Sequence, residues 1–283
     1  MRVAGRAIAS KMPLTTFQKE VLEVILANRG EASHFAGGIV LHSPDDSVRF
    51  SHDFDIFHDA TEDLLVASLK DVSSLRTAGF EVELCDNEEK WTKTSSFRKA
   101  RVRSGSDTVE LDWALDSAFR FFPIVHDEKL GWRLHLFDMA VNKALALASR
   151  TETRDYIDIL ELCRIYPLEA ILWAACGKDP GFSPILLHKM VGRFARIDPL
   201  TLHEIKARNL DPVQMKEEWT GFHDKALHEM TLLADEQPDM PIGVSFVNEK
   251  GAPGWIRSNP SLKVHAPSLR GCWPSIKGDH FAH

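Results

Sequence analysis

Asp53 and Asp55 have the residue type and the spacing of a metal-binding pair on a β-strand. Side chains of a strand alternate between its two faces, so these carboxylates would share one face while Phe54 and Ile56 point to the other. Neighbouring carboxylates repel each other, and a divalent cation between them removes the repulsion. Mg²⁺ prefers such oxygen ligands, usually one or two carboxylates together with phosphate oxygens. The pair therefore predicts a site for Mg²⁺, or for Mn²⁺ in its place; a hairpin with two solvated aspartates is the alternative.

A double glycine, Gly37-Gly38, precedes the aspartate pair and predicts a phosphate site. Glycine has no Cβ, so backbone N–H groups there can approach a bound anion. An apolar strand candidate comes before the glycines and helix-like residues follow them. This order would place the free N–H groups of a helix N-terminus at the turn. Arg49 and Ser51 flank the aspartate strand and would contact phosphate or support the metal ligands. An ordinary turn is the alternative for the glycines.

A third carboxylate is expected from a neighbouring strand, because three carboxylates hold the two cations of a two-metal transfer site. Asp112 fits best in the sequence, since Val109 and Leu111 would face the core while Asp112 shares the site face with Glu110. Glu110 and Asp116 are the alternatives for this position.

These motifs, in this order, resemble those of AbiEii-type abortive-infection proteins, which belong to the DNA polymerase β-like nucleotidyltransferase superfamily. The resemblance spans roughly residues 30 to 165, and the segments that carry it are 35–41, 49–57, 109–112, 142–150 and 154–159. The first two are similar to the nucleotidyltransferase motif and the third to the strand of the third carboxylate. The last two are similar to the family's lysine helix and to its Arg-Asp-x-x-Asp helix. Ile39 replaces a hydroxyl residue that many members carry, and His52 stands where an acidic residue is common.

The resemblance implies a nucleotidyltransferase that moves a nucleoside monophosphate from a nucleoside triphosphate to a hydroxyl acceptor. It further implies a toxin-like component of a toxin–antitoxin or phage-defence pair, with an RNA such as tRNA as the acceptor and a cognate antitoxin as a partner. Two other classes fit the same motifs. One is a nucleotidyltransferase that acts on a small molecule such as an antibiotic, and the other is a nucleotide-binding protein that has lost catalysis.

Lys143 lies at the centre of an apolar helix candidate. A lysine on the buried side needs an anionic partner, and a triphosphate would serve as one; a surface lysine that reaches water is the alternative. The resemblance implies that the next helix contributes to nucleotide binding and catalysis, which assigns Arg154 to the nucleotide. Asp155 and Asp158 share a helix face. Asp158, or else Asp155, is a candidate to accept the proton of the acceptor hydroxyl, unless the two merely cap the positive end of the helix.

Composition agrees with a soluble intracellular enzyme. The chain has 283 residues, enough for a sizeable core and two lobes, with 44% hydrophobic and 27% charged residues. No apolar run approaches the roughly 18 residues that span a bilayer, and the start lacks the apolar block of a signal peptide, so we expect a cytoplasmic protein with no membrane partner. The four cysteines are widely spaced, which favours neither a zinc site nor a disulfide framework. A net charge of −7 argues against a protein that coats nucleic acid through a global basic field.

The expected fold class is α+β. A nucleotidyltransferase lobe with a small mixed β-sheet and flanking helices would occupy residues 1–136, a mainly helical lobe 137–237, and a tail with a possible β-hairpin 238–283. The first helix would begin at Thr15 or Thr16 and end near Gly30. Further strands are expected over 33–36, 80–84, 108–113 and 132–136, and further helices over 61–76, 137–149, 154–165, 167–176, 183–195, 201–207 and 211–234.

Overall fold

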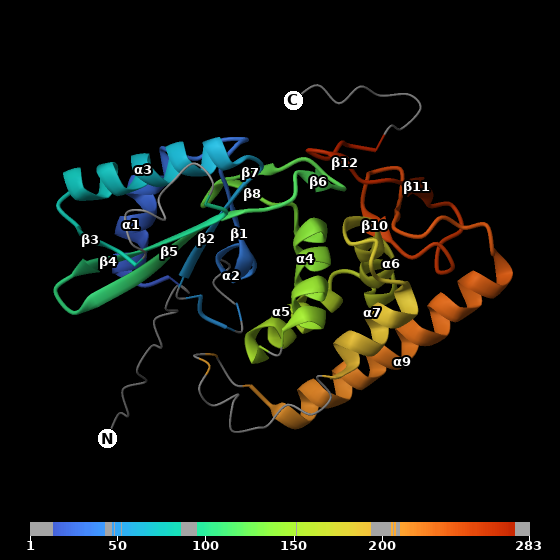
Figure 1. Cartoon of the computed structure of the whole chain (residues 1–283). Helices are drawn as coiled ribbons and strands as arrows, with labels where there is room; N and C mark the ends of the chain where they lie inside the picture. Colours follow the sequence, from blue (N-terminus) through green and yellow to red (C-terminus); the bar gives the residue numbers. More distant parts are fainter. Residues whose placement is uncertain are drawn as a thin grey trace, which may run out of the picture.

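The computed structural model describes residues 14–42, 47, 49–51, 53–85, 95–150, 152–193, 205, 207 and 210–274. Figure 1 shows two parts side by side, a twisted sheet with long helices along it and a group of packed helices. The expected α+β class with a mixed sheet is confirmed. Most of the predicted helix over 201–207, and His52, fall outside the described residues.

The central sheet has seven strands. They are β1 (His34–Ala36), β2 (Asp53–His58), β3 (Glu81–Leu84), β4 (Phe97–Ser104), β5 (Asp107–Leu115), β7 (Val125–Asp127) and β8 (Gly131–Arg133). Their order is β3-β4-β5-β2-β1-β8-β7. β2 runs parallel to β5, and β1 runs parallel to β8, whereas the other neighbours are antiparallel. The two strands that carry the predicted metal ligands are therefore direct neighbours at the centre of the sheet.

β2 and β5 alternate between a buried face and an open face, as their sequences predict. The buried side chains are Phe54, Ile56 and His58 on β2, and Val109, Leu111 and Trp113 on β5. The remaining residues in the middle of both strands are partly exposed on the opposite face. Burial of one face sets the register of each strand, because a slip by one residue would move every apolar side chain into water.

Two helices cover the buried face of the sheet, α1 (Thr16–Leu26) and α3 (Thr61–Thr77). α1 begins at a capping box in which Thr15 Oγ1 accepts from Gln18 N–H and the Gln18 side chain accepts from Thr15 N–H. A short helix, α2 (Gly37–Leu41), follows β1 directly. The strand–glycine–helix order predicted around the double glycine is therefore present.

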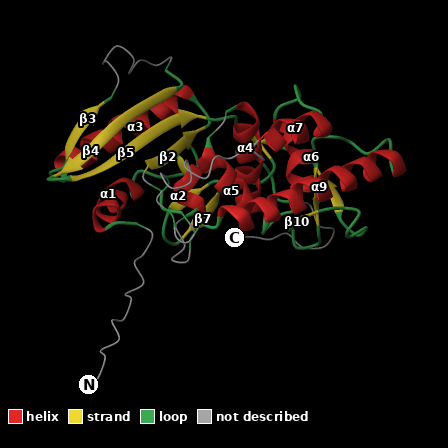
Figure 2. Cartoon of the chain, turned by 90° about the horizontal axis from the view of Figure 1, so that it is seen from below, coloured by secondary structure: helices red, strands yellow, loops and turns green. Residues whose placement is uncertain are grey.

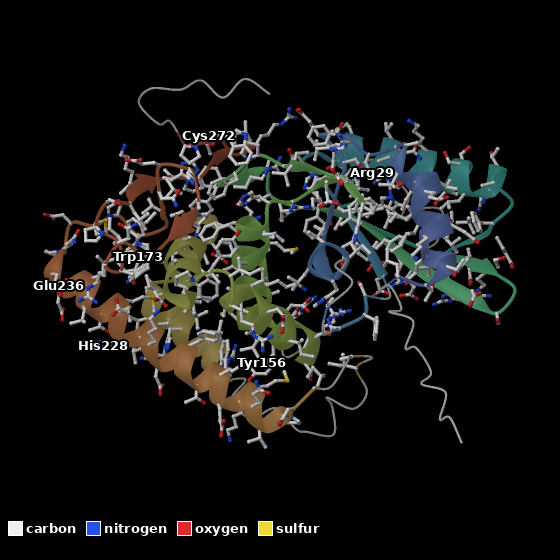
Figure 3. All side chains as sticks on the ribbon, turned by 180° about the vertical axis from the view of Figure 1, so that it is seen from behind. Arg29, Tyr156, Trp173, His228, Glu236 and Cys272 are labelled. Carbon is white, nitrogen blue, oxygen red and sulfur yellow. The ribbon has the colours of Figure 1, made fainter. Side chains whose placement is uncertain are left out.

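The helical part consists of α4 (Leu136–Ser149), α5 (Thr153–Cys163), α6 (Leu168–Lys178), α7 (Pro184–Val191) and α9 (Pro212–Glu236). Figure 2 shows α9 running along the outside of this part, across the other helices. The Tyr156 hydroxyl, labelled in Figure 3, donates to the Met215 carbonyl, and its ring packs edge-on against Trp219. These contacts join α5 to the first turns of α9. α4 begins at Leu136 because His135 caps it, so the predicted strand over 132–136 is shorter than expected.

The C-terminal segment packs against the helices. β9 (Ser245–Val247), β10 (Pro253–Gly254) and β11 (Lys263–His265) form an antiparallel sheet, so the predicted hairpin is present and has a third strand. β12 (Ser268–Leu269) pairs with β6 (Phe119–Arg120). Phe246 and Trp255 belong to the same hydrophobic core as the helices, whereas the sheet and its two long helices enclose a second core. The two cores interlock across the division that we propose near residue 136, since Phe121 and Phe122 belong to the helical core and Met139 to the core of the sheet.

Candidate active site between the sheet and the helices

Four carboxylates gather on the open face of the sheet. Asp53 on β2 lies opposite Glu110 on β5, and Asp55 lies opposite Asp112 in the same parallel register. Neighbouring strands are about 4.8 Å apart, so the Asp55 and Asp112 side chains start from adjacent points on one face. The sequence predicts this shared face from strand periodicity alone. The pairing of Asp55 with Asp112 needs the register of the folded sheet.

Contacts with β4 distinguish Glu110 from Asp112 as candidates for the third carboxylate. Glu110 forms ion pairs with both Lys99 and Arg101, which hold the pKa of its carboxyl below the usual range although burial opposes them. Asp112 has one of these cations nearby, with Lys99 Nζ 3.3 Å from Oδ1. Because Asp112 stands beside Asp55 and Glu110 is committed to two cations, we retain Asp112 as the proposed third carboxylate.

The carboxylates of this face suit a hard divalent cation. Burial raises the pKa of the Asp55 carboxyl to about 6; Lys143 opposes this shift, and Asp112 and Asp53 add to it. Burial also raises the pKa of Asp112. Oxygen donors that are desolvated and repel one another are the donor set that Mg²⁺ or Mn²⁺ would stabilise. Within the described part of the chain, no group of three or more histidine, cysteine, aspartate or glutamate side chains is arranged closely enough to hold a metal ion as it stands. The fit therefore rests on the donor type and charge.

Gly37 and Gly38 make room for side chains of the site itself. Gly37 has a φ of 61°, in the left-handed region, and a Cβ there would overlap the Asp55 carboxylate. A Cβ on Gly38 would lie 2.8 Å from Arg49 Nη2 and 2.9 Å from Ser51 Oγ. The Gly38 N–H donates to Asp55 Oδ2 over 3.3 Å. The glycines therefore allow Asp55 to lie against the start of α2. One backbone amide of the expected phosphate turn, that of Gly38, donates to a carboxylate of the protein itself.

Asp158 is fully buried at the meeting point of three side chains, Arg49, His42 and Lys143. Arg49 donates to it from Nε and Nη2, both at 2.9 Å; His42 Nε2 lies 2.7 Å from Oδ1, and Lys143 Nζ lies 2.7 Å from Oδ2. We call these four residues the Asp158 cluster. Burial opposes ionisation, but Lys143, His42 and Arg49 together hold the pKa of Asp158 far below its usual range. Such a carboxylate is a weak base near neutral pH. We therefore propose that Asp158 positions Arg49 and Lys143, and that it does not act as the general base.

Asp155 is bound in a similar way. Arg150 Nε lies 2.6 Å from Oδ2, and Lys143 Nζ lies 3.0 Å from Oδ1. Burial would raise the pKa of Asp155, but Arg150 and Lys143 hold it below its usual value. Asp155 is therefore no better a base than Asp158.

Lys143 is buried between these two aspartates, which excludes the surface-lysine alternative. Burial alone would lower the pKa of its ammonium group, but Asp158 and Asp155 raise it above the usual value, so the group stays charged. The anionic partners expected for a buried lysine are thus supplied by the protein. Its exposed edge still reaches the cavity described next.

A cavity of about 850 Å³ opens between the sheet face and helices α4 and α5. Apart from Asp158, every predicted site residue lines it: Gly37, Gly38, Arg49, Ser51, Asp53, Asp55, Asp112, Lys143 and Arg154. The Arg154 side chain is 43% exposed, and its Nη1 lies 3.7 Å from Asp53 Oδ2. Ser51 Oγ donates to the carbonyl of Asp53, a contact that shapes the start of β2. Residues from both parts of the chain therefore form one site.

Several polar residues of the site carry no motif that singles them out in the sequence. His42 binds Asp158, and Asn142 and Lys178 both bind Asp116 at the far end of the cavity. Asp116 itself, an alternative for the third carboxylate, follows the end of β5 and is neutralised by Lys178. The position of Asn142 directly before Lys143 is the only local signal for this group.

Comparison with known families identifies the chain. A family model described as "Nucleotidyl transferase AbiEii toxin, Type IV TA system" matches residues 23–236. This span contains all the predicted site residues and most of the described helices. No curated protein matches the sequence.

Solved structures of similar proteins include a proposed nucleotidyltransferase from H. pylori, with a TM-score of 0.48 and 16% sequence identity over 78% of this chain and 99% of that one. JHP933 from Helicobacter pylori has a TM-score of 0.47 and 14% identity over 78% of this chain and 95% of that one. MenT4, a nucleotidyltransferase toxin from Mycobacterium tuberculosis H37Rv, has a TM-score of 0.43 and 13% identity over 73% and 91% of the two chains. In the described part of this chain, no helix combines the length and the apolarity needed to cross a membrane.

Proposed function

The chain belongs to the AbiEii family of nucleotidyltransferase toxins of type IV toxin–antitoxin systems, and on this premise we propose that it transfers a nucleoside monophosphate from a nucleoside triphosphate to a hydroxyl group of an RNA such as tRNA. The observation that carries this proposal is the side-by-side position of Asp55 and Asp112 on the floor of a cavity whose opposite wall is cationic.

The cationic wall would hold the triphosphate. Among the described residues, Arg49, Lys143 and Arg150 form their ion pairs with two carboxylates, Asp155 and Asp158, so three cations share two counter-charges. The buried ion pairs keep Arg49 and Lys143 in place before any ligand binds, and preorganised charges stabilise a transition state more than mobile ones do. The wall is thus suited to a ligand with several negative charges.

Asp53, Asp55 and Asp112 would hold Mg²⁺ or Mn²⁺. When bound, the cation would neutralise triphosphate charge and lower the pKa of the attacking hydroxyl. The raised pKa of the buried Asp55 carboxyl supports this assignment, because a bound cation would relieve the repulsion that contributes to it.

The proton of the acceptor hydroxyl needs an acceptor other than Asp158 or Asp155. The acceptor oxygen forms a bond to the α-phosphorus, the bond from this phosphorus to the bridging oxygen breaks, and pyrophosphate leaves. We propose that the hydroxyl proton passes to solvent, because the carboxylates of Asp53, Asp55 and Asp112 would be engaged by the cation.

RNA is favoured as the acceptor by cations at the edge of the cavity. The side chains of Arg150 and Arg154 line the cavity and are 47% and 43% exposed, so both can also reach phosphates of a polynucleotide outside it. The family description supports a cognate antitoxin as a partner. A cytoplasmic location remains part of the proposal.

Transfer of labelled nucleotide tests the proposal. The protein is incubated with Mg²⁺, total RNA or purified tRNA, and each of the four α-³²P-labelled nucleoside triphosphates, and label on RNA is followed on denaturing gels. We expect labelled RNA, and at least a roughly 100-fold lower rate in the variant with Asp53→Ala and Asp55→Ala. Asp235→Ala, at an exposed position on α9, is the matched control and should label RNA like the wild type.

Labelling that survives the double substitution would overturn the proposal. Label that moves to a small hydroxyl compound such as an aminoglycoside, and not to RNA, would identify a small-molecule transferase. Nucleotide binding with no transfer to any acceptor would identify a binding protein of the same fold.

A further inference from the structure

A second polar cluster lies in the same cavity, and the transfer reaction proposed above leaves it without a role. Asp116 Oδ2 accepts from Lys178 Nζ at 3.0 Å and from Asn142 Nδ2 at 3.1 Å. The three residues come from the end of β5, the last turn of α6 and the middle of α4, and all three line the cavity. We call them the Asp116 cluster. The Lys178 side chain is only 8% exposed, so the cluster is a preformed site in the wall.

An aromatic row lies between the Asp116 cluster and the proposed metal ligands. Phe97 on β4 and Phe57 on β2 both pair with Ala114 on β5, one from each side. Directly opposed residues on neighbouring strands point to the same face of a sheet. Because Ala114 carries only a methyl group, Phe97 and Phe57 are the large side chains of this row. Both rings line the cavity, and Phe97 is 44% exposed.

The proposed metal ligand Asp112, the aromatic row and the Asp116 cluster follow one another along β5. Asp112, Ala114 and Asp116 are alternate residues, and the Asp116 N–H still donates to the His58 carbonyl, so the strand direction continues to this point. At about 3.3 Å per residue, Asp116 lies about 13 Å beyond Asp112. This separation is comparable with the length of a nucleoside monophosphate, measured from the phosphate to the far edge of the base.

We infer that the base of the incoming nucleotide lies on the row of Phe97, Ala114 and Phe57, and that the Asp116 cluster recognises its polar edge. This inference rests on the proposed function, because Asp55 and Asp112 locate the α-phosphate at the other end of the nucleotide. Stacking on aromatic rings holds any base, since every base has a flat π-face. The polar cluster is what distinguishes one base from another.

The chemistry of the cluster favours bases with an exocyclic amine. Among the described residues, both hydrogen bonds to Asp116 end on Oδ2, so Oδ1 can accept a further N–H. Adenine, guanine and cytosine carry an exocyclic amine that can donate to a carboxylate. Uracil has no exocyclic amine, and its one ring N–H donor on this edge, N3–H, lies between two carbonyl oxygens that a carboxylate repels. We therefore expect discrimination against UTP.

The test compares the four nucleoside triphosphates as ligands and as substrates of the wild type and of Asp116→Asn. Equilibrium binding is measured by calorimetry and turnover as kcat/KM. Asparagine keeps the shape of aspartate and can donate to a uracil carbonyl. We expect the wild type to prefer its best amine-bearing nucleotide to UTP, and Asp116→Asn to reduce this ratio by at least about 10-fold. Asp235→Asn, at an exposed position on α9, is the matched charge control and should leave the ratio unchanged.

A second variant tests the aromatic row without disturbing a buried ion pair. Phe97→Ala should weaken the binding of all four nucleotides by roughly 5- to 100-fold, because the stacking surface is lost for every base. Phe119→Ala is its matched control, since Phe119 is 40% exposed but belongs to β6 and does not line the cavity. It should bind nucleotides like the wild type.

The outcomes separate this inference from the proposed function. An unchanged UTP ratio in a folded Asp116→Asn variant, or wild-type binding by Phe97→Ala, would overturn the inference while labelling of RNA leaves the proposed function in place. Biased nucleotide binding without transfer to any acceptor would support the inference and overturn the proposed function. No binding of any nucleoside triphosphate would overturn both. If Asp116→Asn does not fold, equal wild-type affinities for UTP and the amine-bearing nucleotides overturn the inference.

Discussion

Arg49 and Asp158 form a buried ion pair with two parallel hydrogen bonds of 2.9 Å, although 109 residues separate them in the chain. The pair joins the segment before β2 to α5, and thereby fixes Arg49 in the cationic wall. Lys143 and His42 bind the same carboxylate. The geometry of the cationic wall therefore depends on a residue that does not itself line the cavity.

Replacing Asp158 should destabilise the protein and impair nucleotide binding together. Asp158→Asn leaves Arg49 and Lys143 buried without their full counter-charge, a change that costs about 3–5 kcal/mol in the free energy of unfolding. Urea denaturation measures this cost. Asp127→Asn is the control, because its ion pair with Arg133 is partly exposed and should contribute no more than about 1 kcal/mol. Equal losses in the two variants would contradict the role given to Asp158.

Mg²⁺ should stabilise the folded protein through Asp55. We expect the Tm of the wild type to rise with Mg²⁺ concentration, because a cation that binds only the folded state shifts the unfolding equilibrium. Asp55→Asn should abolish this rise. Without Mg²⁺, the same variant should be at least as stable as the wild type, since it removes a buried charge that Asp53 and Asp112 repel. Differential scanning fluorimetry checks both effects, and a Tm rise that persists in Asp55→Asn would contradict the metal assignment.

Gly37→Ala should cost more than its backbone conformation explains. Gly37 and Gly105 have φ values of 61° and 59°, so alanine pays about the same conformational penalty at both positions, roughly 1–2 kcal/mol. A Cβ on Gly37 would also overlap the Asp55 carboxylate, whereas a Cβ on Gly105 would meet nothing within 4 Å. We expect Gly37→Ala to lose nucleotidyl transfer, and Gly105→Ala to transfer nucleotide at a rate similar to that of the wild type. Transfer assays with both variants, each checked for folding by circular dichroism, decide this point.

Two buried histidines should make the protein less stable in mild acid. Burial lowers the pKa of His34 to about 4 and that of His58 to about 3, from 6.5. As the pH falls from 6.5 towards 4, the unfolded chain binds protons that the folded chain excludes, so the free energy of unfolding falls with pH. Each histidine contributes a slope of at most about 1.4 kcal/mol per pH unit in this window.

His34→Leu should reduce that slope at little structural cost, because neither ring nitrogen of His34 has a hydrogen-bond partner among the described residues. His228→Leu, at an exposed position on α9, is the control and should leave the slope close to that of the wild type. Urea denaturation between pH 4 and 7 measures both slopes. A His34→Leu slope equal to that of the wild type would contradict the prediction.

The strands of the site could be predicted because they follow a local rule. Asp53 and Asp55 alternate with apolar residues, as do Glu110 and Asp112, and a strand with one buried face must place such polar residues together on the other. The helix after Gly37-Gly38 also follows from local order. The capping box at Thr15 likewise depends on residues three apart.

The role of Asp158 could not be predicted in this way. Its spacing from Asp155 on one helix face suits a catalytic base as well as a structural carboxylate. The choice depends on Arg49 and His42, which reach it from the other part of the chain. The same applies to the double glycine, whose sequence suits a phosphate turn but whose lack of side chains is required by Asp55 and Arg49.

The sequence by itself determined which residues share the open face of the sheet and the family to which the motifs belong, because periodicity and apolar patterning act over a few residues. Only the tertiary structure decided which carboxylate stands beside Asp55, which aspartates can take up a proton, and which polar residues lie at the far end of the cavity. The physical reason is that strand register and the pKa of a buried carboxylate depend on partners that the fold brings from distant parts of the chain.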